Sequence, residues 1–228
     1  MLQQIAEQGN FVVAFNFSHN GGTIEQPIDF PDLEAFGNDN FSKQQDDLQS
    51  VIDEVLSSDF KFASHVNAQN VTIIGHSRGG AMAMIKTAQE KRITKIITLA
   101  SISTYETSFP TGEALENWKK EGVMYITNGR TKQEMPLYYQ LFENYQANKE
   151  RFNAGNAAGL LAVPHLIVHG TKDTSVTMDN ADLIHANSKQ SELFVLDTDH
   201  VFGAKQPWES SKMPEALQIV TDKIIEFL

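Results

Sequence analysis

The sequence predicts an α/β fold in which helices cover both faces of a mainly parallel sheet. Short β-branched runs alternate with longer segments of helical periodicity along the 228 residues. The runs are almost continuously apolar, which is typical of strands buried on both faces. Hydrophobic residues make up 41% of the chain, enough for one core, and we expect a single domain over residues 1–228.

The individual elements follow from these patterns in chain order. Strands are predicted for residues 11–17, 71–74, 95–99, 165–168 and 193–196. Helices are predicted for residues 41–57, 80–91, 177–186 and 214–228, the last with Pro214 in its first turn. The first helix has an apolar stripe of Leu48, Val51, Ile52, Val55 and Leu56, and the last has one of Leu217, Val220, Ile224, Ile225 and Leu228.

Residues 101–161 are polar, rich in aromatic residues and too long for a simple connection, so we expect them to form an inserted cap. Inside it, Asn128-Gly129 favours a tight hairpin turn between residues 123–127 and 130–135. A helix is predicted for residues 137–147, with aromatic side chains at Tyr138, Tyr139, Phe142 and Tyr145.

Composition excludes several classes of function. A formal net charge of −11 argues against a nucleic-acid partner, and no apolar run approaches the roughly 20 residues that cross a membrane. The absence of cysteine excludes thiolate chemistry and is compatible with a reducing compartment, so we expect a cytoplasmic protein. No histidine pair has the spacing of a helical metal site, and we expect neither a metal nor a cofactor.

The segment from Gly75 to Gly80 reads Gly-His-Ser-Arg-Gly-Gly and lies between a predicted buried strand and a predicted helix. In that setting Gly-x-Ser-x-Gly forms a nucleophile elbow with Ser77 at its tip. We expect a side chain at Gly75 or Gly79 to collide with neighbouring backbone. The backbone amide of Arg78 is then placed to stabilise an oxyanion.

A nucleophilic serine needs a base, and the base needs an acid that holds its tautomer. Asp173 follows the 165–168 run and His200 follows the 193–196 run, so both fall where parallel strands end. We therefore predict Ser77, Asp173 and His200 as a catalytic triad. Asp197 and Asp199 stay open as alternative acids.

Other residues near these motifs have two interpretations each. His76, Trp118, Tyr138 and Tyr139 are candidates for a substrate pocket, but the three aromatic residues are equally expected to form the core of the cap. The Arg78 side chain either binds a substrate carboxylate or pairs with a structural acid. His76, His165 and His169 lie in or next to predicted strands, where a packing role is more usual than a ligand role.

At these motifs the sequence resembles the α/β-hydrolase superfamily, especially its dienelactone-hydrolase-like and prolyl-oligopeptidase-like bacterial esterases. The elbow, His-Gly-Thr-Lys-Asp at 169–173, His-Val-Phe-Gly at 200–203 and the segment 15–21 carry the resemblance. It implies hydrolysis through an acyl-enzyme intermediate. Substrate choice varies too widely in this superfamily to be carried over.

The chain departs from this family pattern at its start. In such proteins a strand and a His-Gly loop, which supplies the second oxyanion donor, precede the helix that residues 2–8 resemble. Nothing precedes Met1 here, so we expect an N-terminally incomplete fold with activity lowered about 10²–10³-fold. Alternatively, the 11–17 run pairs with the elbow strand, or another chain fills the gap.

We therefore expect a serine hydrolase, most simply a carboxylesterase acting on a small-molecule ester, without a membrane or nucleic-acid partner. A peptidase or amidase on short peptides is the alternative enzyme, because the same triad supports it. A catalytically impaired, hydrolase-like binding protein is the alternative without chemistry. The sequence leaves the oligomeric state open.

Overall fold

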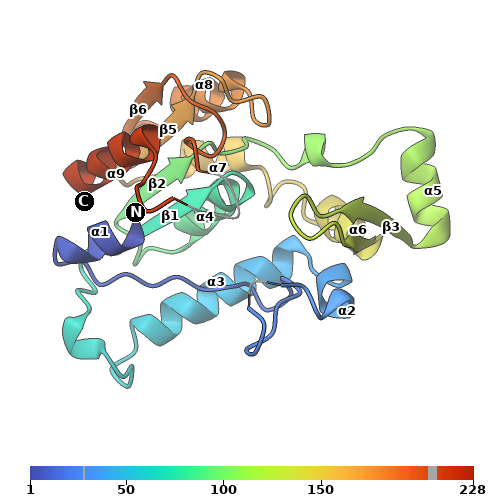
Figure 1. Cartoon of the computed structure of the whole chain (residues 1–228), viewed down its shortest axis with the longest axis horizontal. Helices are drawn as coiled ribbons and strands as arrows, with labels where there is room; N and C mark the ends of the chain where they lie inside the picture. The colour runs from blue at the N-terminus through green and yellow to red at the C-terminus, as the bar shows by residue number, and fades with distance from the viewer. Residues whose placement is uncertain (28, 205–209) are drawn as a thin grey trace. The chain divides into compact units, whose positions relative to one another are not determined.

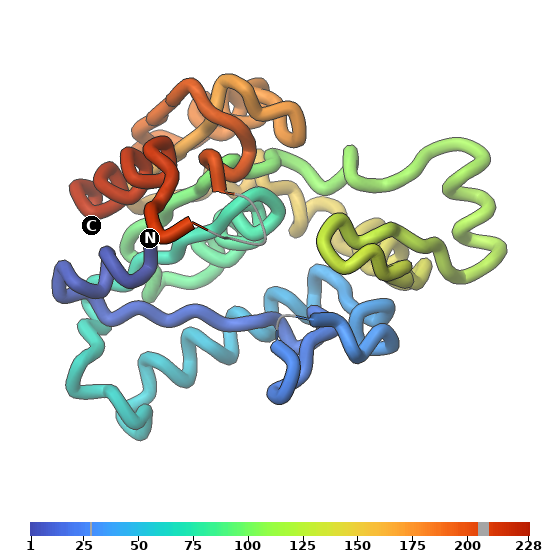
Figure 2. The backbone as a smooth tube through the Cα atoms, in the orientation of Figure 1, coloured from blue at the N-terminus to red at the C-terminus, as the bar shows by residue number. Residues whose placement is uncertain are grey.

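The computed structural model describes residues 1–27, 29–204 and 210–228. The chain divides into two compact units. The first contains Met1–Val13, Val55–Thr104 and Asn153–Leu228, and the second contains Ala14–Glu54 and Tyr105–Phe152. The colours in Figure 2 show that the first unit is assembled from stretches that lie far apart in the sequence.

The first unit holds a four-stranded sheet in the order β1 (Thr72–His76), β2 (Lys95–Leu99), β5 (His165–Gly170) and β6 (Ser191–Leu196). Every neighbouring pair is parallel. All residues of β5 are buried, as the continuous apolar pattern indicates. The predicted parallel sheet and four of its five predicted strands are thus confirmed (Figure 1).

The strand predicted for residues 11–17 is wrong. The segment carries no strand pairing, and the chain passes from the first unit to the second after Val13. Within the described residues β1 pairs with β2 alone, so the alternative in which the 11–17 run pairs with the elbow strand is also wrong. Strand propensity reflects packing on a pleated surface, and here Phe11 contacts Phe60 and Phe62 instead.

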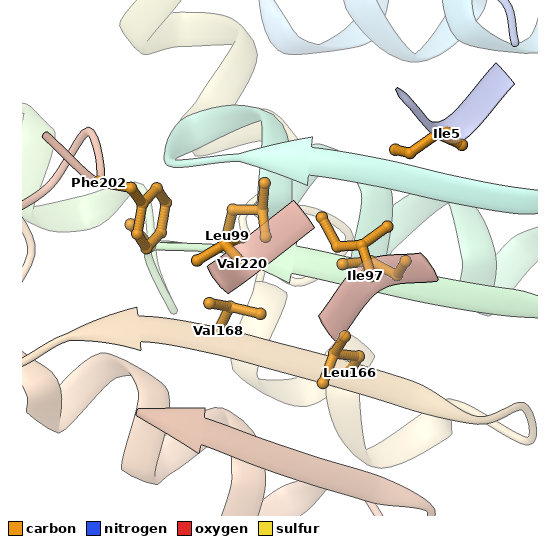
Figure 3. Packing of buried hydrophobic residues seen from close by; sticks show 9 residues of the cluster. Ile5, Ile97, Leu99, Leu166, Val168, Phe202 and Val220 are labelled. Atoms are coloured by element: carbon orange, nitrogen blue, oxygen red, sulfur yellow. The ribbon is translucent and has the colours of Figure 1, made fainter. Parts of the chain in front are cut away.

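One face of the sheet is covered by α1 (Leu2–Glu7) and α9 (Glu215–Phe227). Their buried side chains meet those of β2 and β5 in a hydrophobic core, which Figure 3 shows from close by. This core comprises Ile5, Ile97, Leu99, Ala100, Leu166, Val168, Phe202, Val220 and Ile224. Pro214 is the N-cap of α9 rather than a residue of its first turn.

The opposite face is covered by α4 (Arg78–Gln89), α7 (Ala154–Leu160) and α8 (Met178–Asn187). Side chains alternate along a strand, so His165 points away from the core that contains Leu166. His165 contacts Ser188, the C-cap of α8, which places α8 on that opposite face. A short 3₁₀ helix, η1 (Ala63–His65), precedes β1.

The second unit contains α2 (Leu33–Gly37), most of α3 (Phe41–Val55), α5 (Glu113–Glu121), α6 (Gln140–Ala147) and the 3₁₀ helix η2 (Glu106–Ser108). Its core is aromatic: Phe41 stacks on Tyr105 with ring centroids 4.0 Å apart and meets Phe152 edge-on. The stripe predicted on α3 contributes Leu48 and Ile52 as buried residues.

The expected cap of residues 101–161 and this second unit have different boundaries. The unit also includes Ala14–Glu54, whereas residues 153–161 lie in the first unit, mostly as α7. The antiparallel pair β3 (Val123–Thr127) and β4 (Glu134–Tyr138) is connected by residues 128–133, so the predicted tight Asn-Gly turn is wrong. The Asn128 amide donates to the Gln133 carbonyl, and Lys132 takes the positive φ of 59°.

The helix predicted for residues 137–147 begins later, at Gln140, because Tyr138 completes β4. The other predicted helices are confirmed to within about two residues at most ends. No described helix combines the length and apolarity needed to cross a bilayer.

Candidate active site

The turn at Ser77 has the geometry of a nucleophile elbow. β1 ends at His76 and α4 begins at Arg78, so Ser77 alone reverses the chain, with φ 55° and ψ −122°. This is a backbone conformation that residues other than glycine rarely adopt, and it must be held by its surroundings. The Ser77 amide donates to Leu99 O at 2.8 Å, and Ser77 O accepts from the Gly80 amide at 3.0 Å.

Close backbone contact explains one glycine of the elbow but not the other. A Cβ at Gly75 would lie 2.3 Å from the Gly79 carbonyl oxygen, so no side chain fits there. A Cβ at Gly79 would meet nothing within 4 Å, and the predicted collision at Gly79 is therefore wrong. Gly79 contributes its carbonyl oxygen to the close contact with Gly75, whereas the Cα of Gly79 faces open space.

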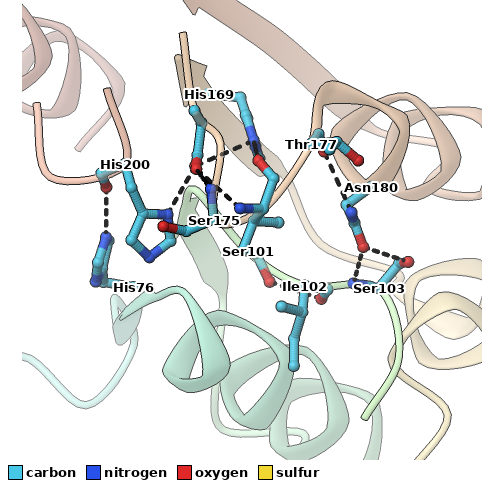
Figure 4. Close-up of polar contacts among 11 residues, drawn as sticks. His76, Ser101, Ile102, Ser103, His169, Ser175, Thr177, Asn180 and His200 are labelled. Carbon is cyan, nitrogen blue, oxygen red and sulfur yellow. Dashed lines mark hydrogen bonds and ion pairs between the residues drawn. The ribbon is translucent and has the colours of Figure 1, made fainter. Parts of the chain in front are cut away.

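Asp173 lies directly after β5 with its carboxylate fully buried. Oδ1 accepts hydrogen bonds from the Ser175 and Val176 amides, each at 2.8 Å. Oδ2 accepts from His200 Nδ1 at 2.7 Å. Figure 4 labels two of the donors, Ser175 in the loop after β5 and His200 in the loop after β6. The arrangement fixes His200 with a proton on Nδ1 and leaves Nε2 available as a base.

The two alternative acids are engaged elsewhere. Asp197 accepts from Lys172 Nζ at 2.8 Å and from Thr171 Oγ1 at 3.1 Å. Asp199 Oδ1 accepts from the Gly203 amide at 2.8 Å and so closes its own loop. The geometry therefore pairs His200 with Asp173 rather than with either neighbour.

Hydrogen bonding sets the charge of Asp173. Burial raises the pKa of its carboxyl group, but hydrogen bonds from Val176, His200 and Ser175 outweigh burial, and the pKa is lowered overall. Asp173 is thus an anion at neutral pH. An anion at this position suits an adjacent imidazole that has to accept a proton.

Two buried histidines support β5 as packing residues. His169 Nε2 donates to Val176 O at 2.8 Å and lies 3.5 Å from Asp173 Oδ2. His165 contacts Thr98 Oγ1 at 2.8 Å, and burial lowers the pKa of His165 to about 3. The sequence places both in a strand, but it does not reveal that His169 braces the loop of Asp173.

The loops of Asp173 and His200 approach each other closely at Gly170. A Cβ there would lie 2.3 Å from the Thr198 carbonyl oxygen. The Lys172 amide donates to that same carbonyl at 3.0 Å, and the Thr171 amide donates to Leu196 O at 2.9 Å. These contacts hold Asp173 and His200 side by side at the ends of adjacent strands.

Ser77 and His200 are less directly connected. Between the described residues no hydrogen bond joins the Ser77 hydroxyl to His200. The two segments are linked instead by His76, whose Nε2 donates to the His200 carbonyl oxygen at 2.9 Å. Contacts between nucleophile and base are often loose without substrate and tighten when it binds.

The three cap aromatics lie in the second unit. Trp118 is buried, donates from Nε1 to Leu137 O at 2.7 Å and contacts Tyr139 edge-on. Tyr138 donates its hydroxyl to Glu34 at 2.6 Å, which raises the pKa of Tyr138. Trp118 and Tyr139 thus belong to the aromatic core of this unit, and a pocket role for the three stays a prediction.

Neither of two hollows in the described part of the first unit is lined by Ser77, Asp173 or His200. One of about 230 Å³ is lined by residues 55–58, Ala63, Val66 and Ala68. The other, of about 470 Å³, is lined by Gly155, Asn156, Gly159, Leu160 and Asn187. Within the described ranges, no group of three His, Asp or Glu side chains is arranged to hold a metal ion.

A parallel sheet with helices on both faces, a strained serine after β1 and an Asp–His pair at the ends of β5 and β6 define the α/β-hydrolase class. The chain belongs to the prolyl oligopeptidase family, whose family model matches residues 2–211. This match confirms the resemblance to the superfamily that the motifs indicate.

Solved structures show the same fold at low sequence identity. Est1E from Butyrivibrio proteoclasticus with ferulic acid bound is 18% identical with a TM-score of 0.61, over 85% of this chain and 69% of that one. A monoacylglycerol lipase from Paleococcus ferrophilus is 15% identical with a TM-score of 0.58, over 84% and 76%. The α/β hydrolase GrgF from a Penicillium species is 14% identical with a TM-score of 0.60, over 83% and 71%. No curated protein sequence matches the chain.

Proposed function

We propose that this protein is a serine hydrolase that cleaves small carboxylic esters through an acyl-enzyme intermediate. Ser77 is the nucleophile, His200 the general base and acid, and Asp173 the residue that orients His200. The observation that carries the proposal is the 2.7 Å hydrogen bond from His200 Nδ1 to a buried, ionised Asp173, at the sheet edge where β1 presents Ser77.

The proposed reaction begins when His200 Nε2 takes the proton of the Ser77 hydroxyl and Ser77 Oγ attacks the ester carbonyl carbon. The backbone amide of Arg78, the first residue of α4, donates to the resulting oxyanion. His200 then gives its proton to the leaving alcohol as the carbon–oxygen bond breaks. Water, activated by the same imidazole, hydrolyses the acyl-enzyme and releases the acid.

A peptidase or amidase is the second candidate. The family match favours it, because the family takes its name from an oligopeptidase. The same groups support it, since amide cleavage requires only that His200 protonate a leaving amine. The structural neighbours include a monoacylglycerol lipase and an esterase domain from Rhodothermus marinus, which favours esters instead. We therefore rank ester cleavage first.

Turnover of matched substrates tests both candidates. The purified chain is incubated with p-nitrophenyl butyrate and with the p-nitroanilide of the same acid, beside a Ser77→Ala control. We expect ester cleavage to be faster and to disappear in the control. Preferential anilide cleavage would support the peptidase, and ester cleavage that persists in Ser77→Ala would reject Ser77 as the nucleophile.

A further inference from the structure

We infer that His76 is a positioning residue that ties the loop of the proposed base to the nucleophile elbow. The inference rests on the proposed function, because it assigns His200 as the base that His76 holds. It also replaces the expectation that His76 lines a substrate pocket. Its basis is the contact between His76 and the main chain of His200.

The direction of that contact is fixed by chemistry. His76 Nε2 lies 2.9 Å from the His200 carbonyl oxygen, and a carbonyl oxygen only accepts. His76 therefore carries its proton on Nε2 and donates. Figure 4 shows the His76 ring directed at this carbonyl, below the loop that holds His200.

Ring contacts hold the imidazole in this orientation. The His76 ring centroid lies 4.7 Å from that of His200 and 6.3 Å from that of Phe202, which is buried in the core. Displacement of water by these neighbours lowers the pKa of His76, although part of the residue is exposed. A neutral imidazole with one donor matches the single acceptor that it meets.

His200 is thus constrained at two points. Asp173 holds the side chain through Nδ1, and His76 holds the main chain through the carbonyl oxygen. Asp173 belongs to the loop after β5, whereas His76 is the last residue of β1 and directly precedes Ser77. The second constraint is therefore the one that sets the base relative to the nucleophile.

Two substitutions separate the hydrogen bond from the ring packing. His76→Phe keeps an aromatic ring beside His200 and Phe202 but has no donor. His76→Gln lacks the ring but places an amide N–H at similar reach. Inactivation by a fluorophosphonate probe then reports two quantities, because the inactivation rate constant depends on activation of Ser77 and the dissociation constant depends on binding of the probe.

We expect His76→Phe to lower the inactivation rate constant about 10-fold with an unchanged probe dissociation constant, which corresponds to the loss of one hydrogen bond. We expect His76→Gln to recover most of the lost rate. A larger probe dissociation constant in both variants, with an unchanged inactivation rate constant, would make His76 a pocket residue and overturn the inference. Unchanged kinetics in His76→Phe would also overturn it.

The proposed function and this inference fail in distinguishable ways. If the wild-type chain is not labelled at all, the proposed function fails. The hydrogen bond from His76 to the His200 carbonyl, which we call the tether, is then tested by NMR. In the wild type, the proton shared by His200 Nδ1 and Asp173 gives a downfield resonance, and its observation needs no turnover. Broadening of that resonance in His76→Phe, with recovery in His76→Gln at equal thermal stability, supports the tether. An unchanged resonance in His76→Phe overturns it.

Discussion

Ser77 follows the carboxyl end of β1 and Asp173 follows that of β5, and the protein fixes the two residues in different ways. Asp173 after β5 is buried and saturated by two backbone amides and an imidazole. Ser77 after β1 is half-buried and is held through its backbone, with φ 55° and an amide bond to Leu99 O. The acid is fixed by its side-chain contacts, whereas the serine is fixed by the shape of the turn.

This difference has a chemical reason. A buried anion must be satisfied by hydrogen bonds, because an unpaired charge is expensive to bury. A nucleophile must instead keep its hydroxyl accessible to substrate, so the fold can control only the backbone on which it sits. Substitutions should therefore act through electrostatics at the β5 end and through steric strain at the β1 end.

The largest effect is expected from Asp173→Asn. The Ser175 and Val176 amides need an acceptor at the Oδ1 position, so the oxygen of asparagine faces them and its amide nitrogen faces His200 Nδ1. Two donors cannot pair, and the imidazole then presents the wrong tautomer to Ser77. We expect hydrolysis of p-nitrophenyl butyrate to fall about 10³–10⁴-fold. Asp199→Asn is the matched control, and an equal loss in that variant would contradict the assignment of the acid.

Gly75→Ala tests the steric side of the comparison. The new methyl group would lie 2.3 Å from the Gly79 carbonyl, and we expect a loss of about 3 kcal/mol in the free energy of unfolding measured in urea. Gly79→Ala is the control, because its methyl group meets nothing within 4 Å and alanine favours a helix, so stability should change by less than about 1 kcal/mol. Equal losses of stability in the two variants would show that the close approach of Gly75 to the Gly79 carbonyl does not limit the side chain at Gly75.

His165, the first residue of β5, should make stability depend on pH. Burial lowers its pKa from 6.5 to about 3, so between these values the unfolded chain binds a proton that the folded chain does not. The free energy of unfolding therefore falls as the pH falls through this window, by about 2 kcal/mol between pH 6.5 and pH 5. Urea unfolding of the wild type and of His165→Gln checks this, and parallel pH profiles would argue against a neutral His165.

The smallest effect is expected at the exposed neighbour of the acid. Asp197 forms an ion pair with Lys172, and both side chains are largely exposed, so the pair contributes little to the stability of the fold. We expect Asp197→Asn to change the rate of ester hydrolysis less than about 2-fold. A loss comparable to that of Asp173→Asn would mean that the two carboxylates share the role of the acid.

Much of the first unit could be predicted because its strands are short apolar runs, although only β2 and β5 are largely buried. The runs that become β1, β2, β5 and β6 are almost continuously apolar, and the chemistry-bearing residues follow them directly. The 11–17 run has a similar composition but pairs with no strand of the described residues, and composition alone does not reveal whether a run finds a partner. Its interpretation as a strand fails for that reason.

The second unit was harder to predict, because its contacts join segments distant in sequence. Helix α2 meets the hairpin through Glu34 and Tyr138, which are 104 residues apart. The Asn-Gly pair suggests a two-residue turn, but the register of β3 and β4 sets a longer connection. Within the site, the Asp–His pair follows from strand order, whereas the role of His76 depends on a backbone carbonyl that no motif encodes.

Labelling with a fluorophosphonate probe tests the central claim most directly. The purified chain is treated with the probe beside Ser77→Ala, and peptide mass spectrometry locates the adduct. The account predicts a single adduct on Ser77 that is absent from the variant. An adduct on another residue, or none in a folded sample, would contradict the claim that this chain activates Ser77.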